Sequence, residues 1–178
     1  MNAAKTYGYV LKSLKKEKSR YYDDFEVNKL AVKQYGLSLK YSSKKFKNNT
    51  KIVLEAVKQN GYALKYASKE LRENKKFILK CIKLHGYALS HVGNQYKKNI
   101  NIVNLAVSNY PLALEYAHPN LRKNKKLVMK ALKINCFSLQ FADRSLYYDK
   151  DIINNAIKKD KYIEKYLNLN NPNYVISR

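Results

Sequence analysis

A repeat with a step of 25 residues constrains the fold of this chain more than any other feature of its sequence. Small residues recur at this step, and glycine, leucine and aromatic residues recur in phase with them. The four series are Ala31, Ala56, Cys81, Ala106, Ala131, Ala156; Gly36, Gly61, Gly86, Pro111, Cys136, Lys161; Leu39, Leu64, Leu89, Leu114, Leu139, Glu164; and Tyr41, Tyr66, His91, Tyr116, Phe141, Tyr166. Series that keep one phase predict tandem structural units that begin near residues 25, 50, 75, 100, 125 and 150.

The spacing inside one unit predicts a helix followed by a turn. Apolar residues from Ile52 to Val57 lie at i, i+1, i+4 and i+5, which predicts an amphipathic helix over about 50–60. Asn49 or Thr50 would accept backbone N–H groups at its start, and Asn or Asp recurs at this position with the same step. We expect Gly61 to end the helix in the left-handed conformation.

A second apolar stripe, from Ala63 to Leu71, predicts a second helix in each unit. Helices of about ten residues are marginal alone, so the hairpins must be stabilised by stacking on their neighbours. The expected fold class is all-α, an α-solenoid of short helical hairpins with a 25-residue repeat.

The ends of the repeat array are less regular than its middle. Gly8–Leu11 is similar to Gly36–Leu39 but shifted by three residues, so we expect a partial unit over 1–24. Polar residues in the last unit suit a terminal repeat that faces water. The sequence therefore predicts a single helical-repeat domain over 1–167 and a C-terminal tail over 168–178.

The charge of the chain is strongly positive. Its 178 residues include 36 Lys and Arg against 13 Asp and Glu, a formal net charge of +23. Such a field attracts polyanions. The sequence has no signal-peptide pattern and no apolar run of about 18 residues, so we expect no membrane insertion and a cytoplasmic location, or the host cytosol if a phage delivers the protein or it acts as an effector. Two cysteines are too few for a disulfide framework, which fits a reducing compartment.

One stretch of the sequence carries a family resemblance. Gly61–Lys76 reads GYALKYASKELRENKK and is followed by FILKCI, and this pattern resembles the repeats of domain of unknown function 4116, a tandem helical family. The resemblance covers about residues 25–160. It implies a helical repeat fold and no established activity, so it assigns no catalytic residue. Pro111, Cys136 and Lys161 depart from the glycine of the pattern.

Residues that carry catalytic chemistry show no converging motif. His85, His91 and His118 have no metal-binding spacing, and the acid pairs fall at helix starts, where they suit the helix dipole. Cys81 occupies an alanine position, which favours a buried structural role, whereas Cys136 occupies a turn position and is expected to be partly exposed. We therefore predict no catalytic residue, no metal site and no cofactor. A ribonuclease built around His85, His91 or His118 is a further alternative.

Basic residues also follow the repeat and define the candidate binding residues. The helix row and the loop row, as we call them, would each place one cation on every layer. Tyrosines at the start of the second helix are candidates for stacking on bases, whereas those of the series that includes Tyr41 are expected to lie mostly in the core. The helix row is Lys33, Lys58, Lys83, Lys133 and Lys158; the loop row is Lys47, Arg72, Lys97 and Arg122; the tyrosines are Tyr62, Tyr87 and Tyr162.

These observations lead to two hypotheses from different classes. The first is a non-enzymatic binding protein that holds the backbone of RNA or DNA, or a nucleoprotein complex, through the basic rows. The alternative is a protein-interaction module or inhibitor, of the phage or bacterial counter-defence or effector type, that grips an acidic protein surface. The sequence leaves the partner and the oligomeric state open.

Overall fold

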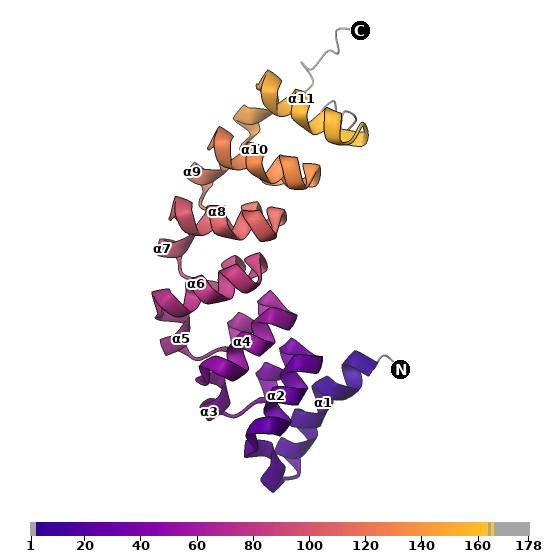
Figure 1. Ribbon diagram of the computed structural model, residues 1–178, viewed down its shortest axis with the longest axis vertical. Helices are drawn as coiled ribbons and strands as arrows, with labels where there is room; N and C mark the ends of the chain where they lie inside the picture. Colours follow the sequence, from indigo (N-terminus) through magenta and orange to yellow (C-terminus); the bar gives the residue numbers. More distant parts are fainter. Residues whose placement is uncertain (1–2, 164, 166–178) are drawn as a thin grey trace. The chain divides into compact units, whose positions relative to one another are not determined.

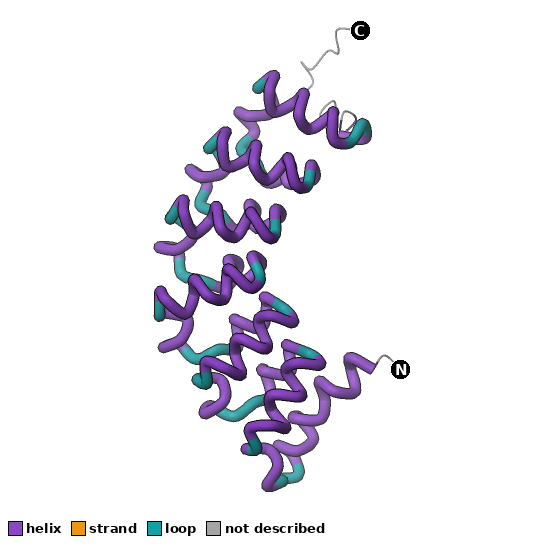
Figure 2. Tube along the Cα trace, viewed as in Figure 1, coloured by secondary structure: helices purple, strands orange, loops and turns teal. Residues whose placement is uncertain are grey.

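The computed structural model describes residues 3–163 and 165, and Figure 1 shows that these residues fold into short helices joined by short connections. Figure 2 shows no strand in this part of the chain. The protein comprises two compact units, Met1–Gly93 and Asn94–Arg178. The all-α repeat fold is thus confirmed. The single domain over 1–167 stays a prediction, and the expected tail at 168–178 lies outside the described residues.

Each unit alternates α-helices with 3-10 helices, which are labelled η. Unit 1 contains α1 Ala3–Lys16, η1 Arg20–Asp23, α2 Phe25–Gln34, η2 Gly36–Tyr41, α3 Lys44–Lys47, α4 Thr50–Gln59, η3 Gly61–Tyr66, α5 Lys69–Glu73, α6 Lys75–Leu84 and η4 Gly86–His91. Unit 2 contains α7 Asn94–Lys97, α8 Ile100–Asn109, η5 Pro111–Tyr116, α9 Pro119–Arg122, α10 Lys125–Ile134, η6 Cys136–Phe141, η7 Arg144–Tyr148 and α11 Lys150–Lys159. Among the described residues, no helix is long and apolar enough to cross a membrane.

The first helix of each repeat forms as its sequence predicts. In α4, Ile52, Val53, Ala56 and Val57 are fully buried. Asn49 caps the helix, since its Oδ1 accepts the backbone N–H groups of Lys51 and Ile52 at 3.0 and 3.1 Å. The predicted bounds and the predicted cap are therefore both confirmed.

The prediction of one continuous second helix is wrong. Residues 61–66 form the 3-10 helix η3, and a separate one-turn α-helix, α5, follows. Ala67 and Ser68 between them are extended, because Ser68 caps α5 with its hydroxyl and donates its backbone N–H to the carbonyl oxygen of Lys47 at 2.8 Å. The chain leaves the helix at this point to form a backbone hydrogen bond with the preceding repeat.

The expectation that Gly61 is left-handed is also wrong. No glycine in the described part of the chain has a positive φ. Glycine is needed here for close packing instead, since a Cβ on Gly61 would lie 2.9 Å from the backbone nitrogen of Ala88 in the next repeat. A Cβ on Gly36 would lie 2.4 Å from the carbonyl oxygen of Ala56. These two glycines let η2 approach α4 and η3 approach η4.

The similarity of Gly8–Leu11 to a later turn does not extend to structure. These residues lie in the middle of α1, a helix of 14 residues, and do not form a turn. Leu11 is fully buried, and α1 packs against α2 and η2. The segment provides a helical face that covers the first repeat.

Packing inside each unit forms two layers, one of longer α-helices and one of 3-10 helices. In unit 1, α2 packs on α4 and α4 on α6, while η2 packs on η3 and η3 on η4. In unit 2, α8 packs on α10, α10 on α11, and η5 on η6. The leucine series fills the core, and its described members, Leu39, Leu64, Leu89, Leu114 and Leu139, are fully buried.

The aromatic series at the end of each 3-10 helix is less buried than predicted. Tyr41, Tyr66, Tyr116 and Phe141 are half-buried, whereas a core position was expected, and Tyr166 lies outside the described residues. Partial burial suits tyrosine, which combines an apolar ring with a polar hydroxyl.

Candidate functional site

The helix row is the most uniform exposed feature of unit 1. Lys33, Lys58 and Lys83 lie on α2, α4 and α6 at the same position of each repeat, and all three side chains are exposed. Because each of these helices packs on the next, the three cations follow one another at about 8–10 Å, the usual spacing between packed helices. They lie beside the buried stripe, one residue after Val57 in the case of Lys58.

In unit 2 the members of the helix row lie on α10 and α11. Lys133 and Lys158 are exposed on these two neighbouring helices, whereas Ser108 takes the equivalent position on α8. Lys133 also belongs to an open depression along α10, whose lining consists of lysine and methionine side chains: Lys125, Lys126, Met129, Lys130 and Lys133.

Two of the lysines in this depression are engaged inside the protein. The ammonium group of Lys125 lies 2.8 Å from a carboxylate oxygen of Asp149 and 2.7 Å from one of Asp151. Hydrogen bonding to Asp149 raises the pKa of Lys125, and the same bond lowers the pKa of Asp149. Lys130 donates to Oδ1 of Asn104 at 2.8 Å. Lys126 and Lys133 take part in no ion pair among the described side chains, so their positive charges are not neutralised by a neighbouring carboxylate.

The loop row differs from the helix row because its members are half-buried. The backbone carbonyl oxygens of three members each accept a hydrogen bond from the next repeat. The donors are the N–H of Ser68 to Lys47 at 2.8 Å, that of His118 to Lys97 at 3.0 Å and that of Asp143 to Arg122 at 3.0 Å.

Side chains of the loop row also interact inside the protein. Arg72 donates from Nε to the carbonyl oxygen of Ala67 at 3.2 Å. Burial lowers the pKa of Lys47, and the nearby charge of Lys15 lowers it further. The loop row thus has contacts that join and stabilise repeats.

Two of the three candidate stacking tyrosines contact each other. The rings of Tyr62 and Tyr87, on η3 and η4, are stacked with centroids 6.3 Å apart. The hydroxyl of Tyr62 accepts a hydrogen bond from Lys65 at 2.9 Å, which raises the pKa of Lys65. Tyr162 lies in unit 2 and is 82% exposed.

The histidines occupy structural positions. The His91 ring meets Tyr62 edge-on at 4.4 Å. His85 and His118 each accept, at Nδ1, the backbone N–H of the residue two positions later, at 3.3 and 3.4 Å. Burial lowers the pKa of His85. His85 and His91 belong to unit 1, and His118 belongs to unit 2.

The cysteines and acidic residues form no reactive cluster in the described part of the chain. Cys81 is fully buried, and burial raises the pKa of its thiol to about 12. Cys136 is only 6% exposed, so the expectation of partial exposure is wrong. It begins η6, which packs on α10 and η5. No group of three or more His, Cys, Asp or Glu side chains that could hold a metal ion occurs among the described residues.

A second capping series was missed by sequence reasoning. The residue that follows the first α-helix of a repeat accepts, with its side chain, the N–H group two positions later after α4, α6, α10 and α11. Its members are Asn60, His85, Asn135 and Asp160. The sequence signal was a run of acceptor side chains at the same 25-residue step. This series fixes the backbone amides of Tyr62, Tyr87, Phe137 and Tyr162.

The helix caps also show that neighbouring repeats are of two types. Asn49, Asn99 and Asp149 each accept two N–H groups, of the second and third residues after the cap. The alternate positions, Asp24, Asn74 and Asn124, accept only that of the third. The capping pattern therefore repeats every 50 residues, which groups the 25-residue repeats into pairs.

These features define a tandem helical-repeat protein whose repeats come in pairs and carry exposed lysines at a fixed position. The chain belongs to the family described as domain of unknown function (DUF4116), whose model matches residues 24–72, 74–122 and 124–169. Each match spans one pair of repeats. Comparison with curated proteins and with solved structures gave no significant match.

Proposed function

We propose that this protein is a non-enzymatic binding protein that holds the phosphate backbone of RNA or DNA along the helix row. The observation that carries the proposal is the position of Lys33, Lys58 and Lys83, which are exposed at one register on three consecutively packed helices. Regularly spaced cations on a rigid scaffold suit the regularly spaced charges of a nucleic acid backbone.

The surrounding charges support this proposal. The net charge of +23 produces an attractive field for polyanions. Four members of the helix row take part in none of the ion pairs among the described residues: Lys33, Lys58, Lys133 and Lys158. Lysine provides a point charge rather than the bidentate fork of arginine, so the expected contact is with phosphate and not with base edges.

The test is binding of fluorescently labelled RNA and DNA, single-stranded and duplex, of about 20 nucleotides over about 50–200 mM salt. The variant changes Lys33, Lys58 and Lys83 together to Gln. We expect affinity to fall several-fold for each charge, on the order of 50-fold in total, and the magnitude of the salt slope to decrease by about two for single strands and about three for duplexes. Helicity and melting should change little, because exposed substitutions usually cost under about 0.5 kcal/mol.

A matched control removes the same three charges from other elements of unit 1. Lys40, Lys44 and Lys45 are exposed on η2 and α3, outside the helix row. Their change to Gln should weaken binding much less. An equal loss in both variants would show that net charge alone acts, and an absence of binding to every nucleic acid at low salt would overturn the proposal.

A pull-down with and without nuclease separates this function from the alternative of an acidic protein partner. Loss of all partners after digestion agrees with nucleic acid as the ligand. Retention of a single protein by the native chain but not by the helix-row variant would contradict it.

A further inference from the structure

The four capped aromatic residues occupy equivalent positions in their repeats but have different surroundings. Tyr62 and Tyr87 belong to unit 1, and Phe137 and Tyr162 belong to unit 2. The backbone N–H of Phe137 donates to Asn135, and that of Tyr162 donates to Asp160, both at 2.9 Å. The backbone of each residue is therefore held in place by the side chain two positions before it.

In unit 1 the equivalent pair is closed. The rings of Tyr62 and Tyr87 stack at 6.3 Å with an interplanar angle of 29°, and the His91 ring fills the space beside Tyr62 at 4.4 Å. Both tyrosines are half-buried. No ring enters between them unless they separate.

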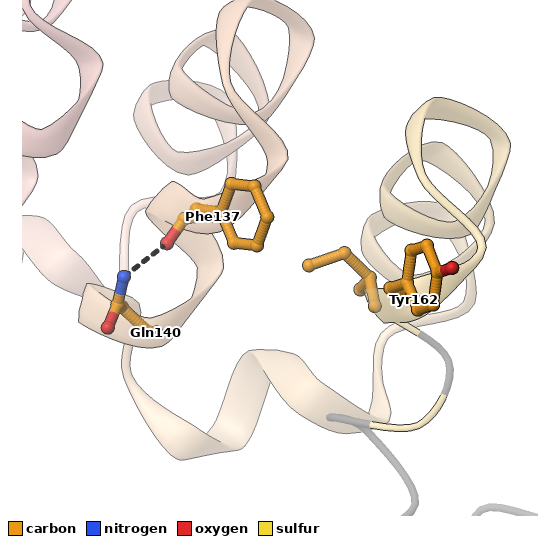
Figure 3. A pocket seen from close by; sticks show the side chains of 4 residues that line it. Phe137, Gln140 and Tyr162 are labelled. Carbon is orange, nitrogen blue, oxygen red and sulfur yellow. Dashed lines mark hydrogen bonds between the residues drawn. The ribbon is translucent and has the colours of Figure 1, made fainter.

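In unit 2 the pair is open. Phe137, Gln140, Tyr162 and Ile163 line a notch of about 120 Å³, into which the Phe137 ring extends (Figure 3). The Phe137 and Tyr162 side chains are 53% and 82% exposed, whereas Ile163 is 3% exposed and forms an apolar floor. An apolar cavity of roughly 150 Å³ accepts one benzene ring, so the notch has the size of a single flat ring that remains partly open to solvent.

One polar side chain borders the notch. The amide nitrogen of Gln140 donates to the carbonyl oxygen of Phe137 at 3.0 Å, which orients the side-chain amide (Figure 3). In Figure 3 its Oε1 lies on the side of the group that faces away from the Phe137 ring and Tyr162. Gln140 therefore closes one side of the notch without offering this oxygen to a ring inside it.

The charges near the notch favour a ring that is attached to phosphate. Lys158, Lys159 and Lys161 are exposed and lie within four residues of Tyr162. The acid between them, Asp160, is engaged by the backbone N–H of Tyr162. An apolar slot for one ring beside several cations matches the two parts of a nucleotide, the base and its phosphate.

We infer that the notch between Phe137 and Tyr162 binds one unpaired nucleobase of a single-stranded nucleic acid. Ile163 supports the base from below and Gln140 borders it. The inference rests on the proposed backbone binding and adds to it a preference for single strands, because paired bases in a duplex present no free face. Every base has such a face, so the site selects strandedness rather than sequence.

The experiment changes Phe137 and Tyr162 together to Leu, which retains apolar side chains but removes both rings. The probes are single-stranded RNA and DNA of about 20 nucleotides with one 2-aminopurine, and duplexes of the same sequence. We expect the double variant to bind the single strands about tenfold or more weakly, the duplexes unchanged, and to lose the stacking-dependent quenching of 2-aminopurine. Both residues are more than half exposed, so the fold is expected to remain, as checked by circular dichroism.

The matched control is Tyr148→Leu, which removes another exposed aromatic ring of unit 2 outside the notch. This variant should bind and quench like the native protein. Unchanged single-strand affinity and quenching in the double variant would overturn the base site, even if the helix-row variant confirms backbone binding. Native protein that binds no nucleic acid would overturn both proposals. The base site would also be overturned if the double variant binds nucleic acid normally but no longer retains a protein partner after nuclease digestion.

Discussion

Gly36 lies where the chain has no room for a side chain. A Cβ at this residue would lie 2.4 Å from the carbonyl oxygen of Ala56 and 2.8 Å from Oε1 of Gln59. The same Oε1 accepts the backbone N–H of Gly36 at 2.7 Å. The residue does not have a positive φ. We therefore expect Gly36→Ala to destabilise unit 1 by forcing η2 away from α4.

The magnitude follows from the contacts. Overpacking costs about 1–3 kcal/mol and a lost hydrogen bond about 0.5–1.5 kcal/mol, so the free energy of unfolding should fall by about 2–4 kcal/mol. In a chain of this size that corresponds to a decrease in melting temperature of roughly 4–16 °C. Thermal and urea unfolding followed by far-ultraviolet circular dichroism measures it.

A second substitution distinguishes close packing from a left-handed turn. Asparagine tolerates the left-handed conformation better than alanine does, so a conformational requirement would make Gly36→Asn the milder change. Close packing makes the larger asparagine at least as destabilising as alanine. The control, Gly8→Ala in the middle of α1, should be neutral or stabilising by up to about 1 kcal/mol. An asparagine variant with nearly native stability would refute the packing argument.

Two further predictions concern titratable groups. Cys81 and Cys136 are buried, and the pKa of Cys81 is about 12, so neither thiol should react with a thiol reagent until denaturant is added; rapid reaction of the native protein would contradict this. Hydrogen bonding to Lys125 lowers the pKa of Asp149, so this carboxylate contributes stability above its unfolded pKa of about 3.8, and the contribution is lost as pH falls through the lower folded pKa. Lys125→Gln should reduce the acid sensitivity of urea unfolding below about pH 4 relative to the native chain, and an unchanged pH profile would show that the ion pair has no effect.

The first helix of each repeat could be predicted closely because independent local signals agree. In α4 the apolar spacing gave the buried face, and Asn49 gave the start. Each signal acts within one turn of the same segment, so no knowledge of the neighbouring repeat was needed.

The second half of the repeat could not be predicted in the same way. Spacings of three and four residues between Ala63 and Leu71 fit one α-helix as well as a 3-10 helix followed by a short turn of α-helix. The break occurs at Ser68, where a hydrogen bond to Lys47 of the preceding repeat determines the backbone conformation. That partner is 21 positions away, and local periodicity does not reveal it.

For the candidate site, the sequence located both basic rows but did not show that the helix row is exposed and the loop row half-buried. Lys58 is exposed because it follows the buried stripe of its own helix, which the sequence shows directly. Lys47 and Arg72 are half-buried because of contacts with carbonyl groups and neighbouring segments. The difference between the closed pair at Tyr62 and the open notch at Phe137 likewise depends on the surrounding rings.

His85 shows how a residue with catalytic chemistry can meet a purely geometric requirement. It shares its position in the repeat with Asn60, Asn135 and Asp160, and all four accept the backbone N–H two residues later. Only a neutral imidazole has a lone pair for this hydrogen bond at Nδ1. Burial lowers the pKa of His85 and so favours that neutral form. The position requires an acceptor atom within reach of the backbone, and this requirement accounts for a histidine that a search for catalytic residues would single out.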